Sequence, residues 1–297
     1  MTIKNHSKIC LMVSAGIMAL ALILSVFGLG INFGIDFAGG LSMKYAMGGE
    51  YVKADVEGIL NGLNLGGYSI AEQGGNEINI RINTLAEDEV QTVQASLEEA
   101  LFAKYPNAVR SGDTNYVGPV AGKTLLSNAI YSVLLASVLM LVYIAFRFDL
   151  NSGIAAVVGL IHDVLMMLAF MVLLRNFVQM NSSFIAAMLT IVGYSINNTI
   201  VIFDRIRENA RKTPAGAREA VVNRSVKECL GRTLTTTATT LVTIVALYIL
   251  GVDSIREFAL PIIIGIASGV YSANMINGYI WAMLESKLNL LEKAITA

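Results

Sequence analysis

The sequence predicts an α-helical polytopic membrane protein with six transmembrane helices and one small α+β domain outside the membrane. Hydrophobic residues make up 55% of the 297 residues, charged residues only 14%, and the mean hydropathy is +0.63. This composition is too apolar for an ordinary water-soluble domain. Six apolar stretches, each about 20 residues long, can cross a hydrocarbon core of roughly 30 Å as helices. They lie near residues 9–31, 124–146, 152–174, 183–203, 233–251 and 258–282.

The basic residues predict the orientation of these spans, because cytoplasmic loops are enriched in Lys and Arg. With both termini in the cytoplasm, the inner face carries Lys4, Lys8, Arg147, Arg205, Arg207, Arg211, Lys212, Arg218, Arg224, Lys227, Lys287 and Lys293. The two short outer loops then hold Arg175 and Arg256. The first apolar stretch exceeds 20 residues and lacks a convincing small-x-small cleavage site, so we expect a retained anchor rather than a cleaved signal.

The predicted organisation has four parts. Residues 1–33 form a cytoplasmic tail and the first span, 34–122 an extracytoplasmic domain, 123–284 the second to sixth spans with a cytoplasmic loop at 204–232, and 285–297 a cytoplasmic tail. The loop is polar and rich in Arg, and we expect it to lie along the membrane surface as an amphipathic link. Topology explains its basic residues without a nucleic-acid partner.

The segment 34–122 has the pattern of a ferredoxin-like βαββαβ domain. The predicted elements are, in order, a strand at 41–47, a helix at 52–63, strands at 68–72 and 77–82 around Gly74-Gly75-Asn76, a helix at 87–104 and a strand at 108–117. Thr84 and Glu87 form a T-x-x-E capping box that starts the second helix. An exposed sheet face suits docking of an extended chain or a partner, and a folded spacer is the alternative.

Polar residues inside the third and fourth spans are candidates for an ion path, because polar groups in a bilayer are costly and usually face a bundle interior. His162 and Asp163 lie near the middle of the third span, and Asn197 and Asn198 lie toward the cytoplasmic end of the fourth. His162 and Asp163 are adjacent, so they point about 100° apart and cannot both face one partner. A mid-membrane carboxyl group can take up and release a proton, which makes Asp163 the stronger candidate.

The fifth and sixth spans carry further polar side chains. These are Arg232, the threonines at 233, 235, 236, 237, 239 and 240, and Asn274 and Asn277. The sixth span also contains Gly265-x-x-x-Gly269, which permits close backbone approach. The threonines and asparagines also fit a structural role as hydrogen-bonding groups between helices, and Arg232 also fits an anchor that reaches the headgroups.

Other chemistries find little support in the sequence. Cys10 and Cys229 lie near the predicted cytoplasmic face, where thiols stay reduced, and no spacing suggests a metal site. Ser195 and His162 would be the pair for an intramembrane hydrolase, but Ser195 lacks the flanking glycines that open an oxyanion pocket. No nucleotide-binding loop is present, so energy must come from an ion gradient or from another subunit.

Five motifs resemble the SecF family, whose members pair with SecD in bacterial protein export and belong to the resistance-nodulation-division superfamily. The stretch 192–209, VGYSINNTIVIFDRIREN, resembles the fourth-span signature and includes Asp204 and Arg205. The other matches are Gly34-Ile35-Asp36-Phe37-Ala38-Gly39-Gly40 after the first span, Val117-Gly118-Pro119 before the second, Ile161-His162-Asp163 in the third and Gly231-Arg232-Thr233 through Thr240 in the fifth. The resemblance covers essentially the whole chain.

This resemblance implies a subunit that acts with SecD beside the SecY-SecE-SecG channel in the bacterial cytoplasmic membrane. It implies that the pair draws unfolded translocating polypeptide outward with a proton or sodium gradient, without a bound cofactor or enzymatic activity. The partners implied are these proteins, the polypeptide and membrane lipid. Arg232 resembles the family's basic partner of a coupling carboxylate, and the glycines of the Gly34–Gly40 box would permit a hinge to the outer domain.

Position 198 departs from the family, which usually has Asp directly after the Asn of the fourth span. The amide of Asn198 cannot exchange a proton at accessible pH, which argues against proton relay at this position. An engineered substitution, a lineage that relies on Asp163 or on the partner's acid, and a coupling-dead scaffold all fit. The alternatives to gradient-driven export are a passive structural subunit that stabilises SecD and the channel, and half of a small-molecule or lipid exporter.

Overall fold

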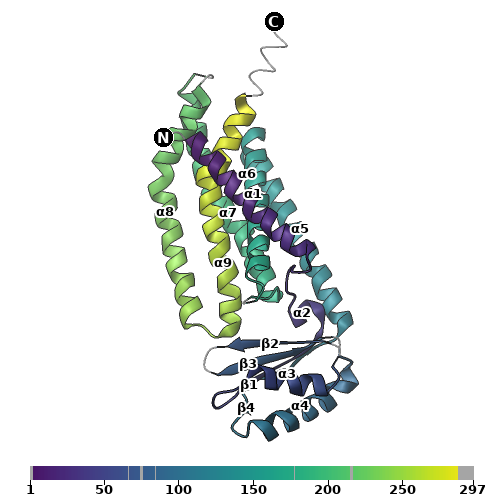
Figure 1. Ribbon diagram of the computed structural model, residues 1–297. Coiled ribbons are helices and arrows are strands. Elements are labelled where there is room, and N and C mark those ends of the chain that lie inside the picture. Colours follow the sequence, from purple (N-terminus) through teal and green to yellow (C-terminus); the bar gives the residue numbers. More distant parts are fainter. Residues whose placement is uncertain are drawn as a thin grey trace. The chain divides into compact units, whose positions relative to one another are not determined.

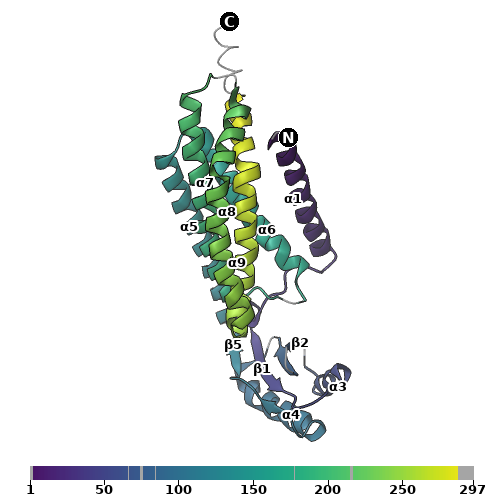
Figure 2. The same ribbon diagram turned by 90° about the vertical axis from the view of Figure 1, so that its left-hand side faces the viewer.

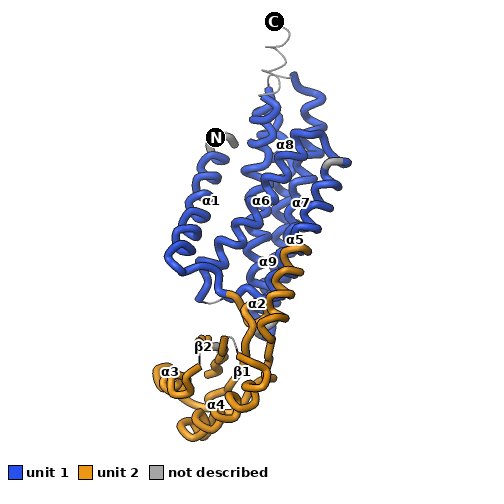
Figure 3. Tube along the Cα trace, turned by 90° about the vertical axis from the view of Figure 1, so that its right-hand side faces the viewer, with its two compact units in different colours: residues 1–32, 132–297 blue, residues 33–131 orange. Residues whose placement is uncertain are grey.

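The computed structural model describes residues 3–65, 67–73, 76–83, 85–176, 178–214 and 217–286 (Figure 1). Backbone contacts divide the chain into two compact units, a helical unit of residues 1–32 with 132–297 and an α+β unit of residues 33–131 (Figure 3). Each unit is described by itself. The predicted tail at 285–297 lies, beyond residue 286, outside the described residues.

Six helices are long and apolar enough to cross a membrane, as the sequence predicted. They are α1 (Ile3–Val26), α5 (Pro119–Arg147), α6 (Leu150–Leu173), α7 (Ser182–Arg211), α8 (Arg218–Leu250) and α9 (Asp253–Ser272). A π-helical turn at Ala273–Asn277 continues α9, and helical residues follow as far as Ser286. The helix α5 contributes residues to both units.

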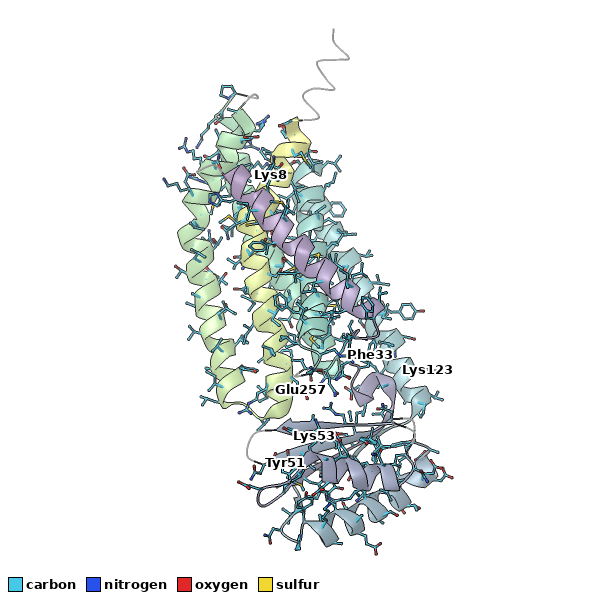
Figure 4. The ribbon with its side chains drawn as sticks, viewed as in Figure 1. Lys8, Phe33, Tyr51, Lys53, Lys123 and Glu257 are labelled. Atoms are coloured by element: carbon cyan, nitrogen blue, oxygen red, sulfur yellow. The ribbon has the colours of Figure 1, made fainter. Side chains whose placement is uncertain are left out.

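Two labelled side chains, Lys8 and Glu257, mark the two ends of the helical unit (Figure 4). The Lys8 end is where α1, α6 and α8 begin and where α5 and α7 end. The Glu257 end is where α9 begins and where α1, α6 and α8 end. The basic residues that the sequence assigned to one face gather at the Lys8 end, apart from Lys287 and Lys293, which lie outside the described residues.

The centre of the helical unit consists of α6, α7 and α9, which run alongside one another (Figure 2). At least half of the apolar window of each central helix is buried, whereas α1, α5 and α8 bury 11% or less of theirs. Burial at Ala155, Ala156, Gly159 and Asp163 follows the three- to four-residue period of one helix face. The outer helices therefore present their apolar surface to lipid or to further helices.

Glycines allow the central helices to approach closely. A Cβ atom at Gly159 of α6 would lie 2.2 Å from Oδ1 of Asn277, and one at Gly265 of α9 would lie 2.5 Å from Cγ1 of Ile191. At Gly269 a Cβ would be 3.4 Å from Cα of Ser195 on α7. The prediction that Gly265 and Gly269 permit close backbone approach is confirmed.

The predicted loop at 204–232 differs from the observed structure. Residues up to Arg211 extend α7, and α8 begins already at Arg218, so this segment does not form a separate helix along the membrane surface. Its charges pair within each helix extension, as between Glu208 and Lys212 and between Arg224 and Glu228, and Arg205 joins the two helices through Glu228. Such ion pairs support helical turns that continue beyond an apolar span.

The α+β unit contains an antiparallel sheet and two helices. Its elements are β1 (Gly40–Ala46), α3 (Lys53–Gly62), β2 (Tyr68–Gln73), β3 (Glu77–Ile82), a 3₁₀ turn (Glu87–Glu89), α4 (Val90–Lys104), β4 (Val109–Arg110) and β5 (Asn115–Val117). The strand order is β2-β3-β1-β4, and β5 also pairs with β1. Alternate apolar residues of β1 and β3 join Leu60 of α3 and Leu97 of α4 in a buried core.

The strand predicted at 108–117 is divided into two short strands, β4 and β5, because the chain turns between Arg110 and Asn115. Both pieces pair with β1, at its two ends, so the sheet is small. The turn residues Gly74 and Gly75 and the capping residue Thr84 lie outside the described residues. Glu87 does begin the 3₁₀ turn that leads into α4.

The Gly34–Gly40 box is a packed turn rather than an open linker. Gly34 precedes α2 (Ile35–Ala38), and Gly39 and Gly40 follow it with φ of 75° and 124°. A Cβ at Gly40 would lie 2.2 Å from the carbonyl oxygen of Ile82. Glycine is required at position 40 both by the positive φ and by this contact, and the hinge between the box and the outer domain stays a prediction.

We expect the contacts of Asp55 to stabilise the α+β unit in a pH-dependent way. Its carboxylate lies 2.9 Å from Nζ of Lys104 and accepts a hydrogen bond of 3.1 Å from the Tyr105 hydroxyl. The bond with Lys104, followed by that with Tyr105, lowers the pKa of Asp55 from its usual value. A lowered folded-state pKa stabilises the fold above the unfolded pKa of about 4, and this stabilisation is lost as the pH falls through the folded pKa.

Asp55→Asn should therefore reduce hydrogen-exchange protection of α3 and α4 at pH 7 and have little effect in strong acid. Comparison of each variant with the unchanged chain at both pH values checks this. Asp88→Asn, at an exposed position in the 3₁₀ turn, is the matched control. An equal loss of protection at both pH values would contradict the electrostatic explanation.

Gly159→Ala should destabilise the helical unit by about 1–3 kcal/mol, because the added Cβ overlaps the buried Asn277 amide. The thermal unfolding midpoint of the purified chain measures this. Gly193→Ala on α7 is the control, since a Cβ there meets no atom within 4 Å. The smaller Asn277→Ala in the Gly159→Ala background should restore part of the loss. Equal midpoints for the two glycine variants would show that the contact is not tight.

Candidate functional site

The site centres on Asp163 of α6, whose side chain is completely buried. The helix α6 is fixed at its start by Asp149, which caps it by accepting hydrogen bonds from the Ser152 amide (3.2 Å) and hydroxyl (2.8 Å). Three turns later the buried face of α6 carries His162 and Asp163 into the centre of the helical unit. A carboxyl group at this depth requires polar partners.

Three serine hydroxyls donate hydrogen bonds to the Asp163 carboxylate. Ser195 of α7 lies 2.5 Å from Oδ2, Ser272 of α9 lies 2.9 Å from Oδ2, and Ser268 of α9 lies 2.8 Å from Oδ1. Nδ1 of His162 is 3.0 Å from Oδ1. The carboxyl group thus joins α6, α7 and α9 through bonds to both of its oxygens.

His162 connects this cluster to α1. Its Nε2 lies 2.8 Å from the Ser14 hydroxyl, which in turn lies 3.0 Å from the hydroxyl of Tyr271. Tyr271 donates a hydrogen bond to the carbonyl oxygen of Cys10. A continuous series of groups that can donate or accept a proton therefore runs from Asp163 to the backbone of α1.

The adjacent residues His162 and Asp163 bond to each other and otherwise have different partners. Ser195 and His162 were the pair considered as nucleophile and base of a hydrolase. The Ser195 hydroxyl instead donates a hydrogen bond to Asp163. The ring nitrogen that a base would use faces Ser14. The arrangement is that of a buried acid with hydroxyl partners rather than of a hydrolase.

A second polar layer, made of amides and threonines, joins α7, α8 and the π-helical turn. Asn198 is buried and donates a hydrogen bond of 3.3 Å to the Thr237 hydroxyl. Asn277 donates to the Thr199 hydroxyl at 2.9 Å, while its Oδ1 is buried without a hydrogen-bond partner. On the same turn Asn274 accepts from Thr233 at 3.2 Å. The amide layer contains no group that titrates near neutral pH.

Two predicted site residues lie away from this interior. Asn197 is exposed and lines a shallow groove between α5 and α7 with Tyr143. Arg232 is exposed on α8, and as the neighbour of Thr233 it points about 100° away from the buried face of Thr233 and Thr237. The structure places Thr237, and not Arg232, as the hydrogen-bond partner of Asn198.

The charged end of the fourth-span motif holds helices together at the Lys8 end. Asp204 accepts two hydrogen bonds, of 3.0 and 2.9 Å, from one guanidinium nitrogen of Arg147 on α5. Arg205 lies 2.5 Å from Glu228 of α8 and also pairs with Glu208. Both ion pairs are partly exposed, so we regard them as links between helix ends rather than as part of the buried site. Asp36 is half-buried in the first turn of the short helix α2 of the other unit.

Sequence reasoning missed Ser14, Ser268, Ser272 and Tyr271. Serine is common in apolar helices, where its hydroxyl can bond the backbone of its own helix, so a single serine gives little signal. A usable signal was present: Ser268 and Ser272 are four residues apart and therefore share one helix face. Within the described parts of the chain, no group of three His, Cys, Asp or Glu side chains could hold a metal ion.

Known proteins resemble this chain over most of its length. The family model described as protein export membrane protein SecD/SecF, C-terminal, matches residues 97–287. Protein translocase subunit SecF of Endomicrobium trichonymphae is 36% identical over 82% of this chain and 78% of its own length. The corresponding subunit of Thermodesulfovibrio yellowstonii is 36% identical over 89% and 86%, and that of Alicyclobacillus acidocaldarius is 37% identical over 88% and 86%.

Solved structures agree with this assignment. The crystal structure of SecDF, a translocon-associated membrane protein from Thermus thermophilus, superposes with a TM-score of 0.80 at 32% identity and covers 95% of this chain. A structure of SecDF in a super-membrane-facing form gives a TM-score of 0.67 at 30% identity and covers 98%. This chain spans 38% and 39% of those two longer chains. On these grounds, the chain belongs to the SecF family of protein-export membrane proteins.

Proposed function

We propose that this chain works with a SecD protein to promote export of unfolded polypeptide through the SecY-SecE-SecG channel, driven by a proton gradient. In this proposal Asp163 is the group of this chain that takes up and releases the proton. The supporting observation is a fully buried carboxyl group that three serine hydroxyls and one histidine surround.

The hydroxyl partners suit a group that changes its protonation state. A serine hydroxyl donates to an ionised carboxylate, and after rotation it can accept from a protonated one. Backbone amides lack this freedom, because they only donate. Protonation of Asp163 would thus rearrange its bonds to Ser195 on α7 and to Ser268 and Ser272 on α9 without leaving a buried polar atom unpaired. Proton uptake would in this way alter contacts among three helices.

The outer surface of α8 supports the proposal of a SecD partner in the membrane. Arg232, Thr236 and Thr239 are exposed on this apolar span. Thr236 and Thr239 satisfy their hydroxyls on their own helix, but the guanidinium of Arg232 is costly next to hydrocarbon. Helices of a second subunit would cover this face and supply polar partners for Arg232.

We further propose that the α+β unit is a ferredoxin-like domain outside the cytoplasmic membrane of a bacterium, and that both termini lie in the cytoplasm. The concentration of basic residues at the Lys8 end supports this orientation. The antiparallel sheet has a covered face and an edge strand, β2, to which a partner or an extended chain could add. A sodium gradient is the alternative energy source.

Asn198 favours a second candidate function, a passive subunit that stabilises SecD and the channel. Its amide is buried in a layer that lacks a titratable group, and it bonds to Thr237. Under this alternative Asp163 would serve only to hold helices together. The two functions make different predictions for substitutions at positions 163 and 198.

Asp163→Asn should abolish the gradient-dependent part of export and leave the gradient-independent part, because an amide of similar shape keeps most contacts but cannot exchange a proton. Export of a model secretory protein into vesicles that contain this chain with its partner, with and without an uncoupler, measures both parts. Asp88→Asn is the matched carboxyl-to-amide control outside the membrane. Asn198→Asp should leave the gradient dependence unchanged.

Two results would overturn this assignment. If Asp163→Asn retains stimulation by the gradient and Asn198→Asp increases it, the coupling acid belongs at position 198. If the gradient has no effect in the unchanged chain or in any variant, the passive function is correct. Equal amounts of each variant in the vesicles are required for either conclusion.

A further inference from the structure

An open cavity of about 510 Å³ lies at the Lys8 end, between the ends of α6, α7, α8 and α9. Its charged and aromatic lining consists of Asp149, Arg207, Arg211, Arg218, Trp281 and Glu285. Both acidic residues are occupied by hydrogen bonds within the protein. Asp149 caps α6 through Ser152, and Glu285 lies 3.0 Å from Arg218.

The arginines of this cavity have unused capacity to bind an anion. Across the described residues, Arg207 and Arg211 have no ion-pair partner, and their positions four residues apart place them on one side of α7. Nε of Arg218 is buried without a hydrogen-bond partner, and its guanidinium lies 5.9 Å from the ring centroid of Trp281. Guanidinium groups that line one cavity favour a phosphate group there, and Arg207 and Arg211 are the two whose charge no carboxylate of the described residues offsets.

A second cavity adjoins the first and is apolar. It has a volume of about 370 Å³, lies between α5 and α6, and shares Asp149 and Leu150 with the arginine cavity. The apolar side chains of its wall are Leu141, Ile144, Phe148, Ile154, Val157 and Val158. Gly153 also lines this cavity. The groove suits a hydrocarbon chain.

We infer that the two cavities together bind an anionic phospholipid, with its phosphate among Arg207, Arg211 and Arg218 and an acyl chain in the groove between α5 and α6. A basic pocket beside an apolar groove at the end of membrane helices matches both parts of such a lipid. Free phosphate would leave the apolar groove without an occupant. A zwitterionic lipid would bring its cation toward three guanidinium groups. This site requires neither export nor proton coupling.

Native mass spectrometry of the full-length chain in detergent tests the site. The probes are phosphatidylglycerol, phosphatidylcholine with the same acyl chains, and glycerol phosphate, which carries the anionic group without acyl chains. We expect retention of phosphatidylglycerol over both other probes. The double variant Arg207→Gln/Arg211→Gln should lower its affinity about tenfold or more, as expected for the loss of two basic groups near a lipid phosphate.

The matched control is Arg224→Gln/Lys227→Gln, which removes the same charge from exposed positions of α8 outside the cavity. Arg211→Gln alone replaces the double variant if the latter does not fold. Equal binding of the two lipids, or equal losses in variant and control, would overturn the headgroup site. Binding of glycerol phosphate as tight as that of phosphatidylglycerol would identify a free phosphate site and overturn the assignment to lipid.

Discussion

The burial of the Asp163 carboxyl group is the constraint on which the packing of the helical unit depends. A carboxylate at the centre of a bilayer costs about 3 kcal/mol on insertion scales, and hydrogen bonds must offset this cost. The donors come from two other helices, so α7 and α9 have to approach α6 closely enough for short serine side chains to reach it. Gly265 and Gly269 make this approach possible, because a larger residue at either position would contact α7.

Two polar layers with different chemistry lie within this packed centre. The hydroxyl layer around Asp163 contains the groups that can exchange protons, and it continues through His162 and Ser14 to α1. The layer around Asn198 contains amides and threonines, which tie α7 to α8 without titrating. With an amide at position 198, Asn198 still bonds to Thr237, and any proton chemistry of the described interior falls to the first layer.

Hydrophobic length predicted the six helices, and strand and helix periodicity predicted the order of the α+β elements, because both patterns follow from burial alone. The pairing of the serines with Asp163 was beyond this reasoning. Which serine hydroxyl faces a given carboxyl group depends on the rotation and height of one helix against another, which a single sequence does not specify. The split of the last strand had a similar cause, since pairing of Arg110 and Asn115 with opposite ends of β1 is a tertiary contact. The sequence also did not reveal that the glycine at position 40 is required by its positive φ and by its close contact with Ile82.

The helix α7 connects the proposed proton site with the proposed lipid site. Its 30 residues span about 45 Å, which exceeds the hydrocarbon thickness of roughly 30 Å, so its last turns extend beyond the apolar core. Ser195, which bonds to Asp163, and Arg207, which lines the arginine cavity, are separated by about 18 Å along this helix. Ser195 and Arg207 belong to one uninterrupted helix, so a rigid-body shift or rotation of α7 displaces both. Any rigid-body movement of α7 that accompanies protonation of Asp163 would extend to Arg207, and an occupied lipid site would oppose it.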